Sequence, residues 1–192
     1  RYNNCLVSAI ELVKEAKLGL SSEVQEAHFN EILDYANNFK NEKLRDFIVD
    51  YFMEHKDKIK VSPAAKKCHH NYLGGLLVHT LECLKFAELN MQIIKDKVDK
   101  EEIYAACILH DIGKIFEYTI DTESGLIEHN EEFHKTWISH SQYGFSICML
   151  NGFERVAKMI AAHHSRADWG ALIDLDQKDL ESYVYLMHHI DD

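Results

Sequence analysis

Residues 103–114, which read IYAACILHDIGK, place a histidine and an aspartate at the end of an otherwise apolar helix. Ile103 and Cys107 precede His110 by seven and three positions, so the histidine shares their apolar face. Gly113 then ends or bends the helix. An ionised carboxylate inside an apolar core is very unfavourable unless it has a partner. The segment therefore predicts a helical core that holds a polar centre.

Other helical segments point a histidine or an aspartate inward in the same way. In each of them, apolar residues stand three, four, seven or eight positions away, which is the spacing of one helix face. The inward-facing residues are His79, His163 and Asp191. A lone histidine on an apolar face is usually a hydrogen-bonded core residue, but several helices that converge on histidine and aspartate indicate a metal site. Because no thiolate is among the candidates, a catalytic site with open positions is favoured over a structural zinc site.

The composition favours an all-α protein in a reducing compartment. One proline and eight glycines in 192 residues are few helix breakers. The net charge of −11 does not favour binding of nucleic acid over the whole surface, although it does not exclude a local basic groove. The five cysteines form no C-x-x-C pair and fit reduced thiols. No apolar run is long enough to span a bilayer, so we expect a cytoplasmic protein without a membrane segment.

The N-terminal part of the chain is typical of helices that precede a second unit. We expect helices over residues 1–18 and beyond, until Val-Ser-Pro at 61–63 interrupts the helical pattern. We therefore predict a helical extension or linker at 1–62 and a main domain at 63–192. Because the chain begins without methionine and stops inside a helical stretch, we expect it to be part of a longer polypeptide with a truncated C-terminus.

The main domain is predicted to be a helical bundle with one small β-hairpin. The hairpin is expected at about residues 117–129, where two short β-prone runs flank Ser124-Gly125. The expected helices cover residues 73–94, 100–112, 139–150, 153–164 and 178–192.

Histidine is the outlier of the composition, with thirteen in 192 residues. Histidine is the commonest metal ligand, so this excess needs an explanation. Four of the histidines follow no inward pattern and are expected on the surface. They are His28, His55, His129 and His134. We expect His188 and His189 to be structural or peripheral, and Cys107 to pack in the core.

Together, His79, His110-Asp111 and Asp191 resemble the H…HD…D signature of the HD superfamily of metal-dependent phosphohydrolases. With His140 and His163-His164 added, the chain resembles the members whose sites hold two metals. Residues 63–79, which read PAAKKCHHNYLGGLLVH, further resemble the YhaM-type 3′–5′ exoribonucleases. Those enzymes carry an OB-fold domain ahead of the HD domain. The resemblance implies an HD-domain helical bundle and a possible missing N-terminal OB-fold.

The resemblance also implies the cofactor and the roles of the site residues. It implies two divalent metal ions, of the kind Mn, Fe, Mg, Ni or Zn. Asp111 would bridge them, and the remaining ligands divide into two sets. The first set is His79, His110 and Asp191, and the second is His140, His163 and His164. A metal-activated hydroxide would attack the phosphoester, so no side-chain nucleophile is needed. Lys114 is expected to bind a phosphate oxygen through its charge, and the alternative is that it is an ordinary surface lysine.

Basic residues near the expected site are candidates for binding the substrate. They are Lys66, His69, His70 and Arg166. Trp169 is a candidate for stacking on a base, or alternatively a core residue. We expect a phosphodiesterase that acts on single-stranded nucleic acid, most like a 3′–5′ exoribonuclease. One alternative is an HD hydrolase of small nucleotides or cyclic dinucleotides, and another is a non-catalytic regulatory module. The apolar faces within 1–62 leave a homo-oligomer open.

Overall fold

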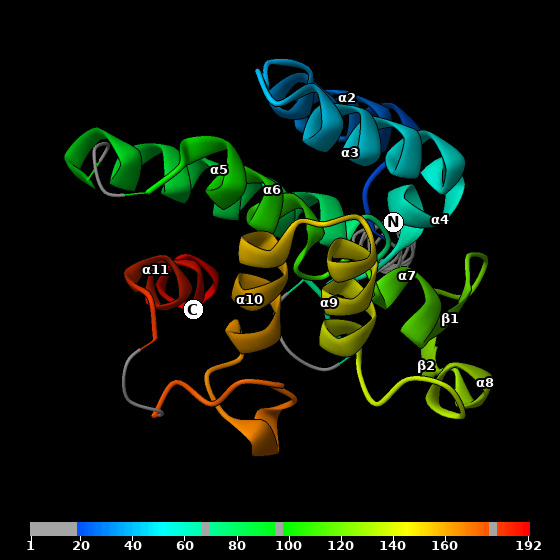
Figure 1. Ribbon diagram of the computed structural model, residues 1–192. Coiled ribbons are helices and arrows are strands. Elements are labelled where there is room, and N and C mark those ends of the chain that lie inside the picture. The colour runs from blue at the N-terminus through cyan, green and yellow to red at the C-terminus, as the bar shows by residue number, and fades with distance from the viewer. Residues whose placement is uncertain (1–18, 67–69, 95–97, 177–179) are drawn as a thin grey trace, which may run out of the picture.

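Helices dominate the computed structural model, which describes residues 19–66, 70–94, 98–176 and 180–192 (Figure 1). The helices are α2 (Ser22–Asn37), α3 (Glu42–Glu54), α4 (Lys56–Val61), α5 (Gly75–Ile94), α6 (Lys100–Leu109), α7 (Lys114–Glu117), α8 (Glu131–His134), α9 (His140–Leu150), α10 (Glu154–Ala162) and α11 (Ser182–Asp191), with a 3-10 turn at Ala167–Trp169. The strands are β1 (Tyr118–Asp121) and β2 (Leu126–His129). The prediction of an all-α fold with a hairpin near 117–129 is confirmed. The helix expected over 1–18 lies outside the described residues.

Short polar side chains fix where several helices begin. Asp99 accepts hydrogen bonds from the backbone N–H groups of Glu101 and Glu102 at 2.8 and 3.3 Å, which starts α6. Ser139 accepts one from Gln142 N at 3.4 Å, so α9 begins at His140. Such caps satisfy N–H groups that have no partner within the helix. The cap at Ser139 therefore decides that His140 stands at a helix N-terminus.

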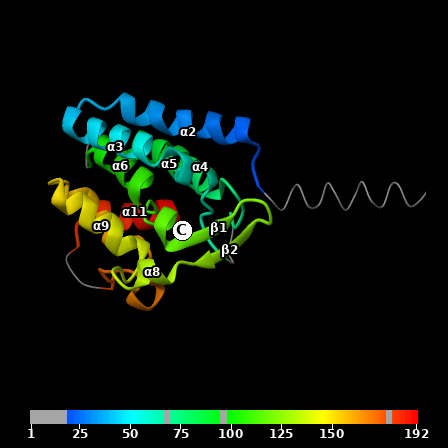
Figure 2. The ribbon, with the colours of Figure 1, turned by 90° about the vertical axis from the view of Figure 1, so that its right-hand side faces the viewer.

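The helices form layers around α5 and α6. In both ribbon views α2 and α3 lie on one side of this pair, and α9 and α11 lie on the other (Figures 1 and 2). All residues of α6 from Ile103 to Leu109 are buried, which explains why its apolar pattern continues around the helix. The buried core runs continuously from Phe29 on α2 to Ile190 on α11. Residues from both predicted segments, 1–62 and 63–192, thus share one core.

The hairpin projects from the bundle beside α7 and α8 (Figure 1). Its strands pair antiparallel, with Ile120 opposite Ile127. Ile127 is buried, whereas most of its strand neighbours are exposed. Among the described helices, none combines the length and the apolar character that a bilayer span requires.

The expected surface positions of two histidines are wrong. His55 is half-buried, and its ring lies 4.6 Å from the Tyr51 ring and 5.3 Å from the Phe116 ring. His28 is half-buried as well. For His55 the physical reason is that aromatic packing between α3, α4 and α7 takes in a residue with no apolar periodicity of its own. His129 and His134 are exposed, as expected.

Candidate metal centre

All seven predicted metal ligands come together where five helices meet. His79 lies on α5, His110 and Asp111 follow the end of α6, and His140 is the first residue of α9. His163 and His164 follow the end of α10, and Asp191 is the last residue of α11. Helix ends allow side chains to turn into a shared space that the helix bodies would fill. The ligand candidates divide into two clusters.

The first cluster contains the two histidines and the final aspartate of the H…HD…D pattern, which are His79, His110 and Asp191. Asp191 Oδ1 lies 2.9 Å from His79 Nε2 and 3.2 Å from His110 Nε2. The two Nε2 atoms are 3.0 Å apart. A fourth residue, Cys83, has its sulfur in the same cluster, with all donor atoms within 4.8 Å of one another. Cys83 stands one helical turn after His79, so its thiol lies among the possible donors, whereas the predicted ligand set contains no thiolate.

The second cluster contains Asp111 and the three remaining histidines. His140 Nε2 and His164 Nε2 are 2.9 Å apart. Asp111 Oδ1 lies 3.3 Å from His140 Nε2 and 3.7 Å from His163 Nε2. All four donor atoms lie within 4.8 Å of one another. The set of three imidazoles and one carboxylate suits a transition-metal ion.

Asp111 stands between the two clusters. Its Oδ1 faces the second cluster, whereas its Oδ2 lies 3.5 Å from both His79 Nε2 and His110 Nε2. The side chain is 2% exposed, so water does not replace these partners. One carboxylate oxygen directed at each cluster is the arrangement that a bridging ligand requires.

The Nδ1 atoms of three histidines are engaged outside the clusters. His110 Nδ1 donates to the Cys107 carbonyl at 2.9 Å, and His163 Nδ1 donates to the Ile160 carbonyl at 2.6 Å. His140 Nδ1 donates to Glu117 Oε2 at 2.8 Å. These bonds orient the rings so that each Nε2 faces the donors of its cluster.

Glu117 is a site residue that the sequence did not reveal. It is buried at the end of α7, and no motif marks it. Burial raises the pKa of its carboxyl, but the hydrogen bond and charge of His140 outweigh burial and lower it. The contact joins residues 23 positions apart, so only the packing of α7 against α9 brings it about.

Two buried atoms of the second cluster show that the residues fit an ion. Among the described residues, Asp111 Oδ1 and His163 Nε2 are buried without a hydrogen-bond partner. Buried polar atoms normally have a partner, and each exception needs an explanation. A carboxylate oxygen and an imidazole nitrogen directed at the same space are both satisfied by a divalent cation.

The electrostatics of the clusters differ. Burial lowers the pKa of His163 and lowers that of His164 to about 2, so both rings are neutral at pH 7. Burial also opposes charge on His110, but Asp111 and Asp191 outweigh it and raise the pKa of His110 to about 10. The pKa values of both carboxyls are held well below the usual range, for Asp111 by Lys114 and His110 against the effect of burial.

Lys114 occupies the wall of a small hollow that opens onto both clusters. Its Nζ lies 2.6 Å from Asp111 Oδ2, and the residue is buried. The hollow, called here the site hollow, has a volume of about 230 Å³. Its lining comprises Ala64, Ala65, His79, Lys114, His163, His164, Trp169, His188, Asp191 and Asp192. His188, expected to be structural or peripheral, lines this hollow and donates from Nδ1 to the His163 carbonyl at 2.7 Å, which fits the structural alternative.

Three of the four predicted substrate-binding residues fall within the described chain, and these three lie outside the lining of the site hollow. Lys66 and His70 are half-buried, and His70 Nε2 lies 3.2 Å from a carboxylate oxygen of Glu82. Arg166 pairs with Asp168 at 2.9 and 3.0 Å and lies over the Trp169 ring, 5.5 Å from its centroid. His69 falls outside the described residues. These four substrate contacts stay predictions.

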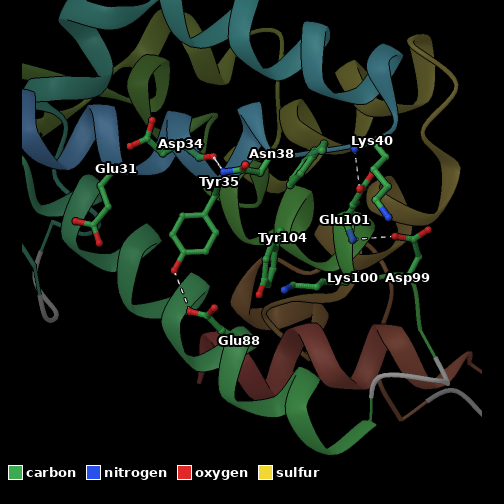
Figure 3. Close-up of a pocket in the computed structure, with 11 residues that line it drawn as sticks. Glu31, Asp34, Tyr35, Asn38, Lys40, Glu88, Asp99, Lys100, Glu101 and Tyr104 are labelled. Atoms are coloured by element: carbon green, nitrogen blue, oxygen red, sulfur yellow. Dashed lines mark hydrogen bonds between the residues drawn. The ribbon is translucent and has the colours of Figure 1, made fainter.

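A larger hollow of about 810 Å³ lies elsewhere, between α2, α5 and the start of α6 (Figure 3). Its walls carry acidic residues and two tyrosines, and Tyr35 donates a hydrogen bond to Glu88 at 3.3 Å. None of the predicted ligands lines it. Volume alone therefore does not locate the metal chemistry in this fold.

Comparisons with known proteins agree with this arrangement. The family model for the HD domain matches residues 76–191. A 3′-5′ exoribonuclease YhaM of Listeria monocytogenes is 27% identical over 195 residues, which cover 96% of this chain and 57% of the relative. A dihydroneopterin 2′,3′-cyclic phosphate phosphodiesterase of Methanocaldococcus jannaschii is 27% identical over 148 residues, which cover 69% of this chain and 58% of the relative.

The chain thus spans less than two thirds of the length of these curated relatives. No solved structure matches it. The matched segment contains His79, the His110-Asp111 pair and Asp191, which are the residues that form the first cluster and the bridge. On this family match, together with the helical fold, the chain belongs to the HD domain family.

Proposed function

We propose that the chain is a metal-dependent phosphodiesterase that releases nucleotides from the 3′ end of single-stranded RNA. The observation that carries the proposal is the position of Asp111, which directs one oxygen to each of two ligand clusters. The names of the YhaM relatives support the direction of cleavage and the substrate. The two clusters support a requirement for divalent ions.

Two bound divalent ions would supply Lewis acidity that lowers the pKa of a water molecule near phosphorus. The protein's own residues then position and neutralise the substrate. The Lys114 ammonium, held 2.6 Å from Asp111, lies at the wall of the site hollow where a phosphate would enter. A buried cation stabilises the charge that develops on the phosphate oxygens more strongly than one in water does.

The nucleotide end of the substrate would lie against Trp169. This side chain is 62% exposed and lines the site hollow, so the part of its ring that Arg166 does not cover is open to a base. Stacking of a base on an aromatic ring contributes roughly 1–3 kcal/mol and tolerates any sequence. The small volume of the site hollow fits a single terminal nucleotide and favours attack from the end of a strand.

The test uses a single-stranded RNA labelled at its 5′ end, with Mn²⁺ as the added ion. We expect release of nucleoside 5′-monophosphates and stepwise shortening of the labelled strand. Asp111→Asn should abolish the reaction, whereas Glu128→Gln, an exposed change on β2, should leave it intact. Cleavage at internal positions, or no shortening with any divalent ion, would contradict the proposal.

A second candidate is a compact phosphodiester such as a cyclic phosphate. The site hollow of about 230 Å³ and the net charge of −11 favour a small substrate over a long polyanion. The archaeal relative is named for a 2′,3′-cyclic phosphate. Turnover of a nucleoside 2′,3′-cyclic phosphate that exceeds turnover of an oligonucleotide, with both lost in Asp111→Asn, would select this candidate.

A further inference from the structure

The position of Cys83 distinguishes the first cluster from the second. Cys83 and His79 are four residues apart on α5, so both side chains leave the same face of the helix. The sulfur lies 3.9 Å from His79 Nε2 and 4.0 Å from His79 Nδ1. It also lies within 4.8 Å of the donor atoms of His110 and Asp191.

Other cysteines in the described residues do not share this position. Cys107 is fully buried and donates to the Met187 sulfur at 4.0 Å, so it packs in the core as expected. Cys148 is also fully buried. Neither belongs to a cluster of possible metal ligands within the described part of the chain. Burial alone therefore does not bring a thiol to the metal centre, and only the register of α5 does so for Cys83.

The donor distances fit a common ion. Four donors that surround zinc tetrahedrally at about 2.0–2.3 Å lie about 3.3–3.6 Å from one another. The bridging Asp111 Oδ2, 3.5 Å from both histidine nitrogens, would be a fifth donor. The measured separations are 2.9 Å for His79 to Asp191, 3.2 Å for His110 to Asp191 and 3.9 Å for His79 to Cys83. These values lie on both sides of the tetrahedral range. An ion at this cluster would therefore have to draw the Cys83 sulfur closer to His79 and spread Asp191 slightly away from the two histidines.

We propose that Cys83 is a thiolate ligand of the ion held by His79, His110 and Asp191, and that it biases this position toward zinc, cobalt or ferrous iron over magnesium and manganese. As the sulfur–metal bond forms, the S–H bond breaks and the proton passes to solvent. Thiolate is a soft donor that favours such ions, whereas carboxylate-rich sites accept magnesium. The inference rests on the proposed function, because it requires an ion at this cluster.

The proposal also makes the two positions unequal. The second cluster offers three imidazoles and a carboxylate, with no sulfur among its donors. The thiolate position is therefore expected to retain its ion through dialysis that removes manganese from the other. A preparation grown without added metal should carry a soft transition ion in the first cluster.

The test is cobalt substitution of the full chain. The wild-type protein loaded with Co²⁺ should show ligand-field absorption in the visible and sulfur-to-cobalt charge transfer in the near ultraviolet. Cys83→Ser should lose the charge-transfer band and keep the ligand-field bands. Cys148→Ser is the matched control, because it removes a buried thiol outside the clusters and should keep both.

A second measurement needs no variant. X-ray absorption of the zinc-loaded wild-type protein should show a sulfur neighbour at about 2.3 Å beside nitrogen and oxygen at about 2.0–2.2 Å. A charge-transfer band that persists in Cys83→Ser, or a zinc spectrum without sulfur, would overturn the role of Cys83 and leave the metal centre standing. Failure of the wild-type protein to take up cobalt at all would overturn the proposed function itself, and with it this inference.

Discussion

At the scale of single residues, the metal centre depends on buried charge that is held by specific partners. The Asp111 carboxylate is 2% exposed, and its nearest cation is Lys114 at 2.6 Å. An ionised group this deep is very unfavourable without such partners. The residues that orient the ligands should therefore matter nearly as much as the ligands themselves.

Glu117 offers a test of that expectation. Glu117→Gln replaces the carboxylate that accepts the hydrogen bond of His140 Nδ1 at 2.8 Å. Loss of such an orienting carboxylate typically weakens metal affinity or activity by about 10–100-fold. We expect a loss in this range when Mn²⁺ binding is titrated by calorimetry. Glu132→Gln is the control, because that exposed glutamate on α8 pairs only with Lys135 at the surface. Equal affinities for both variants would contradict the orienting role.

His110 predicts how metal binding responds to pH. Because Asp111 and Asp191 raise its pKa to about 10, His110 carries a proton at pH 7 in the metal-free protein. An ion at Nε2 must displace that proton, so metal affinity should rise as the pH rises from 7 toward 10. His163 and His164, whose pKa values are lowered, release none in this range.

Release of the His110 proton can be measured by calorimetry of metal binding in buffers that differ in their ionisation enthalpies. The measurement uses the Cys83→Ser variant, because it has no thiol at position 83 that could release a second proton. We expect the observed heat to change with the buffer in proportion to about one proton for each ion bound at the first cluster, and no proton from His163 or His164 at the second. A heat that is the same in all buffers would contradict a protonated His110.

At the scale of elements, the turn after α6 is fixed by close contact with the start of α9. Gly113 stands at this turn, and a Cβ built on it would lie 2.7 Å from His140 Cα and 2.7 Å from the His140 carbonyl oxygen. Both are backbone atoms, which cannot move away without shifting the helix. The absence of a side chain at Gly113 therefore allows the turn that carries Asp111 to approach the start of α9, which carries His140.

Gly113→Ala should accordingly destabilise the protein and disturb metal binding. We expect a loss of about 1–3 kcal/mol in the free energy of unfolding, as for other overpacked sites, measured by urea denaturation. Gly144→Ala is the matched control within α9, where the nearest contacts are 3.1 Å and 3.2 Å. There the gain in helix propensity of about 0.8–1 kcal/mol offsets the crowding. A larger loss at Gly144 than at Gly113 would show that this turn is not tightly packed.

At the scale of the whole molecule, the N-terminal helices and the metal-binding helices share one core. Phe29 of α2 is fully buried and contacts the Phe52 ring at 5.7 Å between centroids. The same core continues to Met187 and Ile190 on α11, next to Asp191. We therefore expect the metal centre to lose its structure in the same transition as α2 and α3.

Phe29→Ala tests this cooperativity. Removal of a buried phenylalanine costs about 3–5 kcal/mol, so the melting temperature should fall clearly. We expect the transition seen by far-ultraviolet circular dichroism to coincide with the loss of cobalt ligand-field absorption. Val24→Ala on the same helix is the control, because Val24 is 39% exposed. Cobalt absorption that outlasts the loss of helix would instead show two independently stable parts.

The sequence by itself determined the longer helices of the described chain, the hairpin and the inward faces that carry His79, His110 and Asp191. These are local properties, since apolar spacing along one helix decides which side chains are buried. The helix expected over 178–192 begins at Ser182 in the described residues, where 180 and 181 are not helical.

Only the tertiary structure decided which atoms meet. Spacing along a helix gives a face, but it fixes neither depth nor the direction of a ring nitrogen or a carboxylate oxygen. The division of the Asp111 oxygens between two clusters, the Glu117 contact with His140 and the entry of Cys83 into the first cluster all depend on how helices distant in sequence pack. Such contacts are set by the depth and rotation of each helix in the shared core, which no local pattern records.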